Sequence, residues 1–247
     1  MTQSFEKNMS EAAAGLGIQL DETKLSQLYT YYEMLVEKNK VMNLTGITEE
    51  SDVIIKHFAD SLSIVRAVDL MKMPDESEHI RLIDVGTGAG FPGLVLKIVF
   101  PELNVTLFDS LNKRLVFLNE VIAALSLTGV ETVHGRAEDY GHNASYRKKF
   151  DIAVSRAVAN MSTLLEYCLP FVKNNGMFIA YKSVESDDEI SSAGAAMNIL
   201  GGRIIKKDDF KLPGTDIDRC LITVAKVKET PKKYPRKAGL PSSEPLK

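Results

Sequence analysis

The sequence predicts a doubly wound α/β fold with a mostly parallel sheet, preceded by an N-terminal helical extension and carrying a late antiparallel strand. Two observations support this prediction. From about residue 80 onward, short apolar runs alternate with helix-length segments, as parallel strands alternate with the helices that cover them. The last two apolar runs have no helix between them. Strands joined by a loop alone are most easily antiparallel neighbours.

The region before the sheet has the periodicity of amphipathic helices. Asp21 is a candidate N-cap, and apolar residues recur behind it at spacings of three and four. Residues 43–46 break this helix, Ser51 can cap the next one, and a second apolar stripe covers residues 54–65. A polar loop is expected at 73–78.

The second part of the chain contains seven expected strands, at 81–85, 105–109, 131–134, 151–155, 177–181, 203–206 and 220–226. The expected helices between them cover 92–100, 113–125, 163–172 and 187–200. These patterns divide the chain into a helical extension at 1–72, a ligand-binding domain at 73–228 and a basic C-terminal tail at 229–247.

Composition narrows the class of protein. Charged residues make up 26% of the 247 residues and hydrophobic ones 45%, which is ordinary globular usage. No apolar run approaches the roughly 18 residues of a membrane helix, and the N-terminus lacks the pattern of a secretory signal. Cys168 and Cys220 are far apart and belong to no metal-binding pattern, so we expect two buried thiols in a cytoplasmic, monomeric protein without a metal site.

Charge is unevenly distributed along the chain. The net charge is −3, yet the segment from Lys226 onward has seven basic and two acidic residues. A polyanion responds to the local field, so this tail is a candidate contact for nucleic acid. A solvated tail without a partner is the alternative.

A glycine-rich turn follows the first expected strand, in the segment LIDVGTGAGFPG at residues 82–93. Glycines in such a turn let the backbone approach a ligand closely. No Lys-Ser or Lys-Thr follows, which excludes a nucleoside-triphosphate loop. Residues 88–93 match the dinucleotide pattern GxGxxG, but Gly86 is the glycine next to the strand and Phe91 occupies the third-glycine position. Pro92 removes a donor that a pyrophosphate would use, so the turn favours a ligand without phosphates, with an NAD-dependent oxidoreductase as the alternative.

Two carboxylates follow the next strands. Asp109 lies 23 residues after Gly86, where an acidic side chain commonly accepts hydrogen bonds from ribose hydroxyls; capping of the following helix is the alternative. Glu138 follows the third strand, with solvent exposure as its alternative. A nucleoside held by glycines and a strand-end carboxylate suggests S-adenosylmethionine, the cofactor of class I methyltransferases with this Rossmann-like fold.

Seven segments, in order, resemble the bacterial small-subunit (16S) ribosomal RNA guanine-N7 methyltransferases, the family once named glucose-inhibited division protein B. They are NLTGI, KHFADSL, LIDVGTGAGFPG, LFDSLNKRLVFL, HGRAEDY, DIAVSRAV and YPRKAG. The resemblance covers nearly the whole chain. It implies transfer of a methyl group from S-adenosylmethionine to a guanine of small-subunit RNA, either free or in a 30S assembly intermediate. The implied cofactor-binding residues are Gly86, Gly88, Gly90, Phe91, Asp109, Ser110, Ala137, Glu138 and Arg156.

The resemblance also implies individual roles. Asp109 and Ser110 would bind the ribose, and Ala137 and Glu138 would flank the adenine. Arg156 would face the methionine end of the cofactor or the incoming guanine, and it is the candidate catalytic residue. His57, Asp60 and Ser61, on the preceding helix, would support the pocket.

Methylation at guanine N7 requires no general base, because the nitrogen already carries a free lone pair. Alignment of donor and acceptor then carries the catalysis. Arg156 can donate to guanine O6, with an ion pair to a strand-end carboxylate such as Asp84 as the alternative. Cys168 lies in an apolar helical run, which disfavours a nucleophilic cysteine.

The expected RNA contacts are cationic. Lys182 ends the fifth strand and is a candidate phosphate contact, with simple solvent exposure as the alternative. Tyr234, Arg236 and Lys237 combine stacking and charge in the manner of RNA contacts. A catalytically silent RNA-binding regulator and a small-molecule methyltransferase remain as alternative functions.

Overall fold

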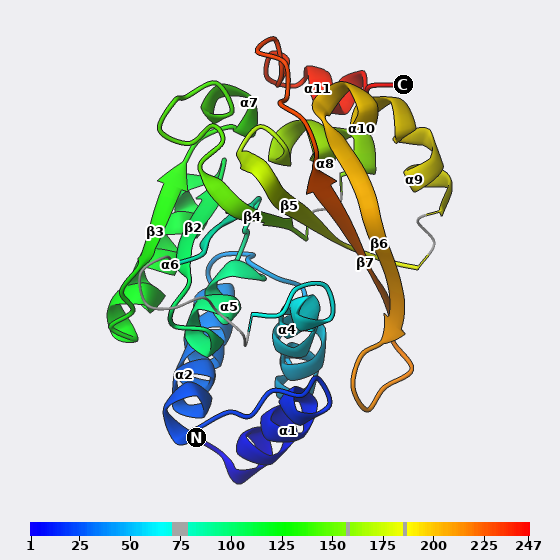
Figure 1. Cartoon of the computed structure of the whole chain (residues 1–247). Helices are drawn as coiled ribbons and strands as arrows, with labels where there is room; N and C mark the ends of the chain where they lie inside the picture. Colours follow the sequence, from blue (N-terminus) through cyan, green and yellow to red (C-terminus); the bar gives the residue numbers. More distant parts are fainter. Residues whose placement is uncertain (71–78, 157–158, 185–186) are drawn as a thin grey trace.

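The computed structural model describes residues 1–70, 79–156, 159–184 and 187–247. It contains one seven-stranded sheet in the order β3-β2-β1-β4-β5-β7-β6, with helices on both faces (Figure 1). The expected polar loop at 73–78 and the expected boundary at residue 72 lie outside the described residues.

The parallel half of the sheet confirms the prediction from alternating apolar runs. Neighbours among the first five strands pair in parallel, and they are β1 (Arg81–Val85), β2 (Asn104–Asp109), β3 (Val130–His134), β4 (Phe150–Ser155) and β5 (Val172–Lys182). The covering helices are α5 (Gly93–Val99), α6 (Asn112–Ala124), α7 (Ala137–Tyr140), α8 (Met161–Cys168), α9 (Asp187–Ser192) and α10 (Gly194–Leu200). The single helix expected at 187–200 is therefore interrupted.

The late antiparallel pair is confirmed as well. β7 (Asp218–Lys226) lies between β5 and β6 (Gly202–Lys211) and is antiparallel to both. β6 is therefore the edge strand, and β7 closes a continuous sheet. A short helix, α11 (Leu240–Ser243), follows near the C-terminus.

The N-terminal region packs on one face of the sheet, beneath α5 in Figure 1. α2 (Glu22–Asn39) begins after the expected N-cap, since the Asp21 carboxylate accepts from Lys24 N. α1 (Gln3–Ala14) was not expected, although Thr2 caps it and its buried side chains recur at helical spacing. The buried residues of both helices belong to the same apolar cluster as those of α5 and α6.

The second expected N-terminal helix is irregular. α3 (Glu50–Val53) has Glu49 rather than Ser51 at its N-cap. It continues into a π-helical turn, η1 (Ile54–Ala59), then α4 (Asp60–Leu62) and the 3₁₀ turn η2 (Ser63–Arg66). π-helical turns are rare and frequently occur at functional sites.

Candidate functional site

A cavity of about 550 Å³ opens at the carboxyl ends of β1, β2 and β4. Ligands of open α/β sheets bind at this edge, because the glycine turn and the strand-end side chains converge there. Eight of the nine expected cofactor-binding residues line it, namely Gly86, Gly88, Phe91, Asp109, Ser110, Ala137, Glu138 and Arg156. Gly90 lies in the same turn but is not among the lining residues.

Gly90 instead permits close packing behind the turn. Its φ is +104°, and a Cβ there would lie 2.5 Å from the Tyr31 hydroxyl oxygen and 2.8 Å from Leu118 Cδ2. The Tyr31 hydroxyl donates to Ala89 O, and its ring stacks on Phe91 with centroids 5.5 Å apart. The N-terminal helix α2 therefore holds the rear of the turn in place.

Asp84 holds the front of the turn. Its Oδ2 accepts from Thr87 Oγ1 at 2.7 Å and from Gly93 N at 2.8 Å. The side chain is fully buried, and burial raises the pKa of its carboxyl to about 6, although both hydrogen bonds oppose this shift. This role of Asp84 was not predicted, because the sequence pattern indicated only an ion pair with Arg156 for this carboxylate.

Asp109 ends β2 and does not cap the following helix, because the N-cap of α6 is Leu111 and receives no side-chain capping bond. Its Oδ1 accepts from Leu111 N at 2.8 Å, just before α6, and its Oδ2 accepts from Gly88 N at 2.9 Å. Arg114 lies 3.4 Å from the same Oδ2. A carboxylate has about four acceptor positions, so Asp109 keeps capacity for a ligand hydroxyl in the cavity.

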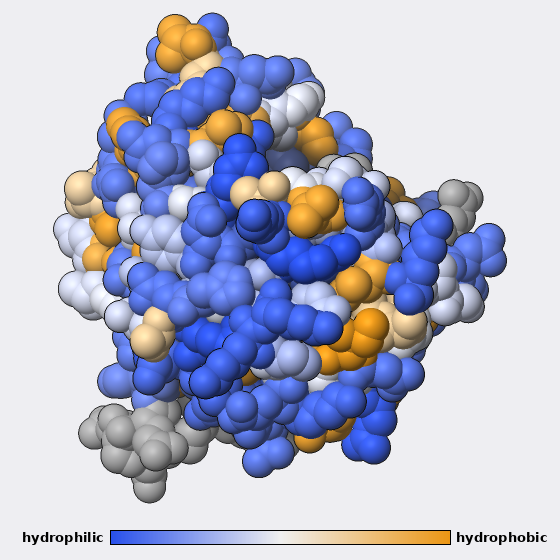
Figure 2. Space-filling model, turned by 90° about the horizontal axis from the view of Figure 1, so that it is seen from above, coloured by the Kyte–Doolittle hydropathy of each residue, from blue (hydrophilic) through white to orange (hydrophobic). Residues whose placement is uncertain are grey.

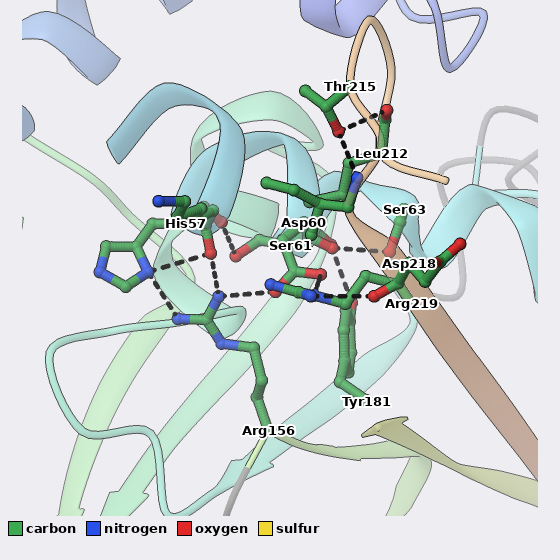
Figure 3. Close-up of polar contacts among 12 residues, drawn as sticks. His57, Asp60, Ser61, Ser63, Arg156, Tyr181, Leu212, Thr215, Asp218 and Arg219 are labelled. Carbon is green, nitrogen blue, oxygen red and sulfur yellow. Dashed lines mark hydrogen bonds and ion pairs between the residues drawn. The ribbon is translucent and has the colours of Figure 1, made fainter. Parts of the chain in front are cut away.

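The opposite end of the cavity is built around Arg156 (Figure 3). Its Nη1 donates to Lys56 O and to Asp60 Oδ2, both at 2.9 Å. The guanidinium carbon also lies 5.1 Å from the centroid of the Phe91 ring. The ion-pair partner of Arg156 is therefore Asp60 and not Asp84, whose carboxylate is engaged by the glycine turn.

Asp60 joins two arginines from different strands. Its Oδ2 contacts Arg156 at the end of β4, and its Oδ1 accepts from Arg219 Nε of β7 at 3.1 Å. Asp60 itself is only 3% exposed. Two cations on one buried carboxylate fix the position of Arg156 by charge-assisted hydrogen bonds.

His57 completes this cluster as a neutral side chain. His57 Nδ1 lies 3.1 Å from both Arg156 Nη2 and Lys56 O. Because a guanidinium can only donate, Nδ1 accepts from Arg156, and the proton on Nε2 is donated to Thr45 Oγ1 at 2.8 Å. Burial, reinforced by the nearby Arg156, lowers the pKa of His57 to about 3. The imidazole stacks on Phe91 with centroids 4.3 Å apart. The π-helical turn η1 carries His57 to this contact.

A second cavity of about 450 Å³ lies beyond Arg156, which lines both spaces. Its other charged lining residues are Lys56, Asp60, Lys182, Glu189 and Arg219. The amine of Lys182 is neither solvent-exposed nor unpaired, since it donates to Ala159 O at 2.7 Å and to Glu189 Oε1 at 2.6 Å. A phosphate contact by Lys182 would have to break that pair.

The C-terminal tail departs from the expected RNA contacts. Tyr234 is buried, and Arg236 forms an ion pair with the fully buried Glu166. Of the three expected contact residues, Lys237 is exposed. Sequence pattern could not distinguish a basic segment that packs on the domain from one that faces solvent.

The expectation for the two cysteines is confirmed. Cys168 and Cys220 are both buried, as expected, and burial raises the pKa of the Cys168 thiol well above its usual value. Within the described ranges there is no cluster of metal-ligating side chains and no helix long and apolar enough to cross a bilayer. The face shown in Figure 2 is mainly hydrophilic, with hydrophobic residues in small separate patches.

Comparison with known proteins decides the family. The family model described as GidB, rRNA small subunit methyltransferase G, matches residues 24–211. This chain belongs to the rRNA small subunit methyltransferase G family. The family member from Acetivibrio thermocellus is 49% identical over 98% of this chain and 97% of its own. The member from Lachnoclostridium phytofermentans is 51% identical over 94% of this chain and 93% of its own.

Solved structures place the family's fold among known architectures. A structure of MtNAS in complex with S-adenosylmethionine has a TM-score of 0.53 at 15% identity, covering 82% of this chain and 75% of the other. The YcgJ protein from Bacillus subtilis has a TM-score of 0.51 at 13% identity, covering 70% of this chain and all of its own. The fold is that of class I methyltransferases, and this family member is an rRNA methyltransferase.

Proposed function

We propose that this methyltransferase transfers a methyl group from S-adenosylmethionine to N7 of one guanine in 16S ribosomal RNA, acting as a monomer in the cytoplasm. The substrate is either the free RNA or a 30S assembly intermediate. The observation that supports this best is the pair of cavities that meet at Arg156. The first cavity is lined by the glycine turn and by Asp109, which suit a nucleoside. The second cavity is lined by Arg156 together with other cationic side chains.

The residues around the first cavity fit S-adenosylmethionine. The turn from Gly86 to Gly90 presents backbone without side-chain bulk, and Asp109 offers acceptor positions to ribose hydroxyls. Ala137 and Glu138 line the same cavity, and in this proposal they flank the adenine. The bound cofactor supplies an electrophilic methyl group on a sulfonium.

The chain's own residues then position the acceptor. Guanine N7 needs no deprotonation, so His57, which is neutral and hydrogen-bonded on both nitrogens, holds Arg156 rather than moving a proton. Arg156 can donate to guanine O6, a pairing common in base recognition. We therefore propose Arg156 as the catalytic residue. Fixing donor and acceptor in line contributes up to about 7–11 kcal/mol to lowering the barrier.

The packing of the turn argues against a dinucleotide. A pyrophosphate needs free backbone donors at the start of the helix, whereas Pro92 has none and Gly93 N donates to Asp84. An NAD-dependent oxidoreductase is therefore disfavoured. A catalytically silent RNA-binding regulator would have the same cavity and would bind the cofactor, but it would not transfer the methyl group.

The test is transfer of radiolabelled methyl from S-adenosylmethionine to small-subunit RNA and to 30S subunits from cells that lack this protein. Digestion then identifies the modified nucleoside. We expect label in 7-methylguanosine at a single site, and loss of label with Arg156→Ala. Cofactor binding without label in any substrate would favour the regulator.

A further inference from the structure

The segment 234–243, which we call the C-terminal strap, lies outside the residues matched by the family model. It includes Tyr234, Arg236 and the helix α11. In Figure 1 it lies on the same side of the sheet as α7 and α8. Each of these two helices contributes side chains to the first cavity, and the strap contacts both.

The strap is firmly anchored beside the cavity. Glu166 of α8, which is 0% exposed, accepts from Arg236 N at 2.7 Å and from Arg236 Nη2 at 2.8 Å. Thr163 Oγ1 donates to Pro241 O at 2.7 Å, and Arg147 Nη1 donates to Tyr234 O at 2.8 Å. These are buried or charge-assisted bonds, the stronger classes of hydrogen bond.

From this anchor the strap reaches a lining residue of the first cavity directly. Gly239 N donates to Glu138 Oε1 at 2.9 Å. Ser242 Oγ donates to Gly239 O at 2.9 Å, so the strap also holds the residue that bonds to Glu138. Glu138 lines the first cavity and is 6% exposed. The strap therefore constrains a buried carboxylate in the cavity wall.

We propose that the C-terminal strap is a positioning element that makes the cofactor site selective for adenine. This inference rests on the proposed S-adenosylmethionine site. With one oxygen of Glu138 held by Gly239, the carboxylate is oriented before the ligand arrives, and less side-chain freedom is lost on binding. A carboxylate accepts from the 6-amino group of adenine and repels the 6-oxo group of hypoxanthine.

The experiment compares two ligands on full-length protein. Dissociation constants for S-adenosylhomocysteine and S-inosylhomocysteine, which differ in the 6-substituent and in the proton on N1, are measured by calorimetry. We expect wild-type protein to prefer the adenine ligand by at least about tenfold, the factor for one hydrogen bond to a charged group. Arg236→Ala releases the anchor and should lower the preference below about threefold, while Arg236→Lys retains part of it.

Two further variants separate positioning from folding. Ser242 is exposed, so Ser242→Ala leaves the fold intact and should lower the preference by a smaller factor, because it removes the bond to Gly239 O. Arg66→Ala removes an arginine that pairs with Asp208 on β6, outside both cavities, and should keep the wild-type preference.

Three results would count against the inference or its basis. Equal weakening of both ligands by Arg236→Ala, with the preference unchanged, would assign the strap a merely structural role. If Arg236→Ala fails to fold, an unchanged preference for the adenine ligand in Ser242→Ala would likewise show that the strap has a merely structural role. Wild-type protein that binds neither ligand would overturn the cofactor assignment itself, and this inference with it.

Discussion

The two ends of the first cavity are held in different ways. At the glycine turn, Asp84 bonds to Thr87 and Gly93, three and nine residues further along the chain. At the other end, Asp60 bonds to Arg156 and Arg219, which are 96 and 159 residues away. One end depends on local backbone geometry, and the other on buried charge brought together by the sheet.

We infer from this difference that one end binds the small ligand and the other positions Arg156. The carboxylate that holds the glycine turn bonds only to nearby residues, and Tyr31 of α2 supports the turn from behind, so the turn is a rigid surface for a small ligand that is always the same. An arginine fixed by long-range ion pairs is sensitive to the packing of β4 and β7 against η1 and α4. We therefore expect substitutions at the two ends to change different measured quantities.

Gly90→Ala should have the largest effect, on the rigid end. A positive φ and a Cβ within 2.5 Å of the Tyr31 hydroxyl oxygen combine backbone strain with overpacking. We expect the free energy of unfolding to fall by about 2–4 kcal/mol, measured by urea denaturation, with weak binding of S-adenosylhomocysteine. Gly46→Ala, with nothing within 4 Å of its Cβ, is the matched control and should change stability by less than about 1 kcal/mol.

Asp60→Asn should weaken the contacts that hold Arg156 and Arg219 at the other end of the cavity. The substitution leaves two arginines around a neutral side chain, so Arg156 loses its fixed position. We expect the methyl-transfer rate to fall at least about tenfold, while the dissociation constant for S-adenosylhomocysteine changes less than about threefold. Asp208→Asn, which removes a partner of Arg66, should keep the wild-type rate. Equal loss of rate and cofactor affinity would show that the two ends are not independent.

The stability contributions of the two ends change with pH in opposite directions. The folded pKa of His57, about 3, lies below its unfolded value of 6.5, so the unfolded chain binds more protons between them and stability is lost as pH falls. The folded pKa of Asp84, about 6, lies above its unfolded value of 3.8, so its contribution is lost as pH rises through that window.

Comparison with His57→Gln isolates the histidine. The stability difference between wild type and this variant should shrink by ~2 kcal/mol between pH 7.5 and pH 5.0, measured by urea denaturation at each pH. A difference that stays constant over this range would contradict a neutral, buried His57.

Lys237→Ala should have the smallest effect, since one exposed cation contributes a single phosphate contact at most. We expect the KM for RNA to rise about two- to threefold, and the salt dependence of binding to lose about one unit of slope. Lys7→Ala, an equally exposed lysine on α1 at the opposite side in Figure 1, should leave both unchanged. If the two variants behave alike, the strap's lysine does not contact RNA.

The glycine-turn end of the cavity could be predicted from the sequence, whereas the contacts of Arg156 at the other end could not. Strands, glycine turn and Asp109 follow from periodicity and spacing within about 25 residues. The partner of Arg156 does not, because only the folded sheet brings β4 and β7 to Asp60. The sequence pattern therefore left Asp84 as the candidate partner.

Two other features escaped prediction for related reasons. The π-helical turn that carries His57 was not predicted, because the apolar stripe at residues 54–65 has the spacing of a regular α-helix. Arg236 was expected to contact RNA because Tyr234, Arg236 and Lys237 combine stacking and charge, yet the buried Glu166 pairs with it. A buried acid elsewhere in the chain is invisible to local charge patterns.

The bond from Tyr31 to Ala89 has a consequence for how the chain is made. During synthesis α2 leaves the ribosome 58 residues before the turn that it supports, and β7, which brings Arg219 to Asp60, comes near the end. Contacts of such high sequence separation form late and slowly. The nascent chain therefore acquires its methylation site only after most of its length has been translated, and shortened chains that stop before β7 should be inactive.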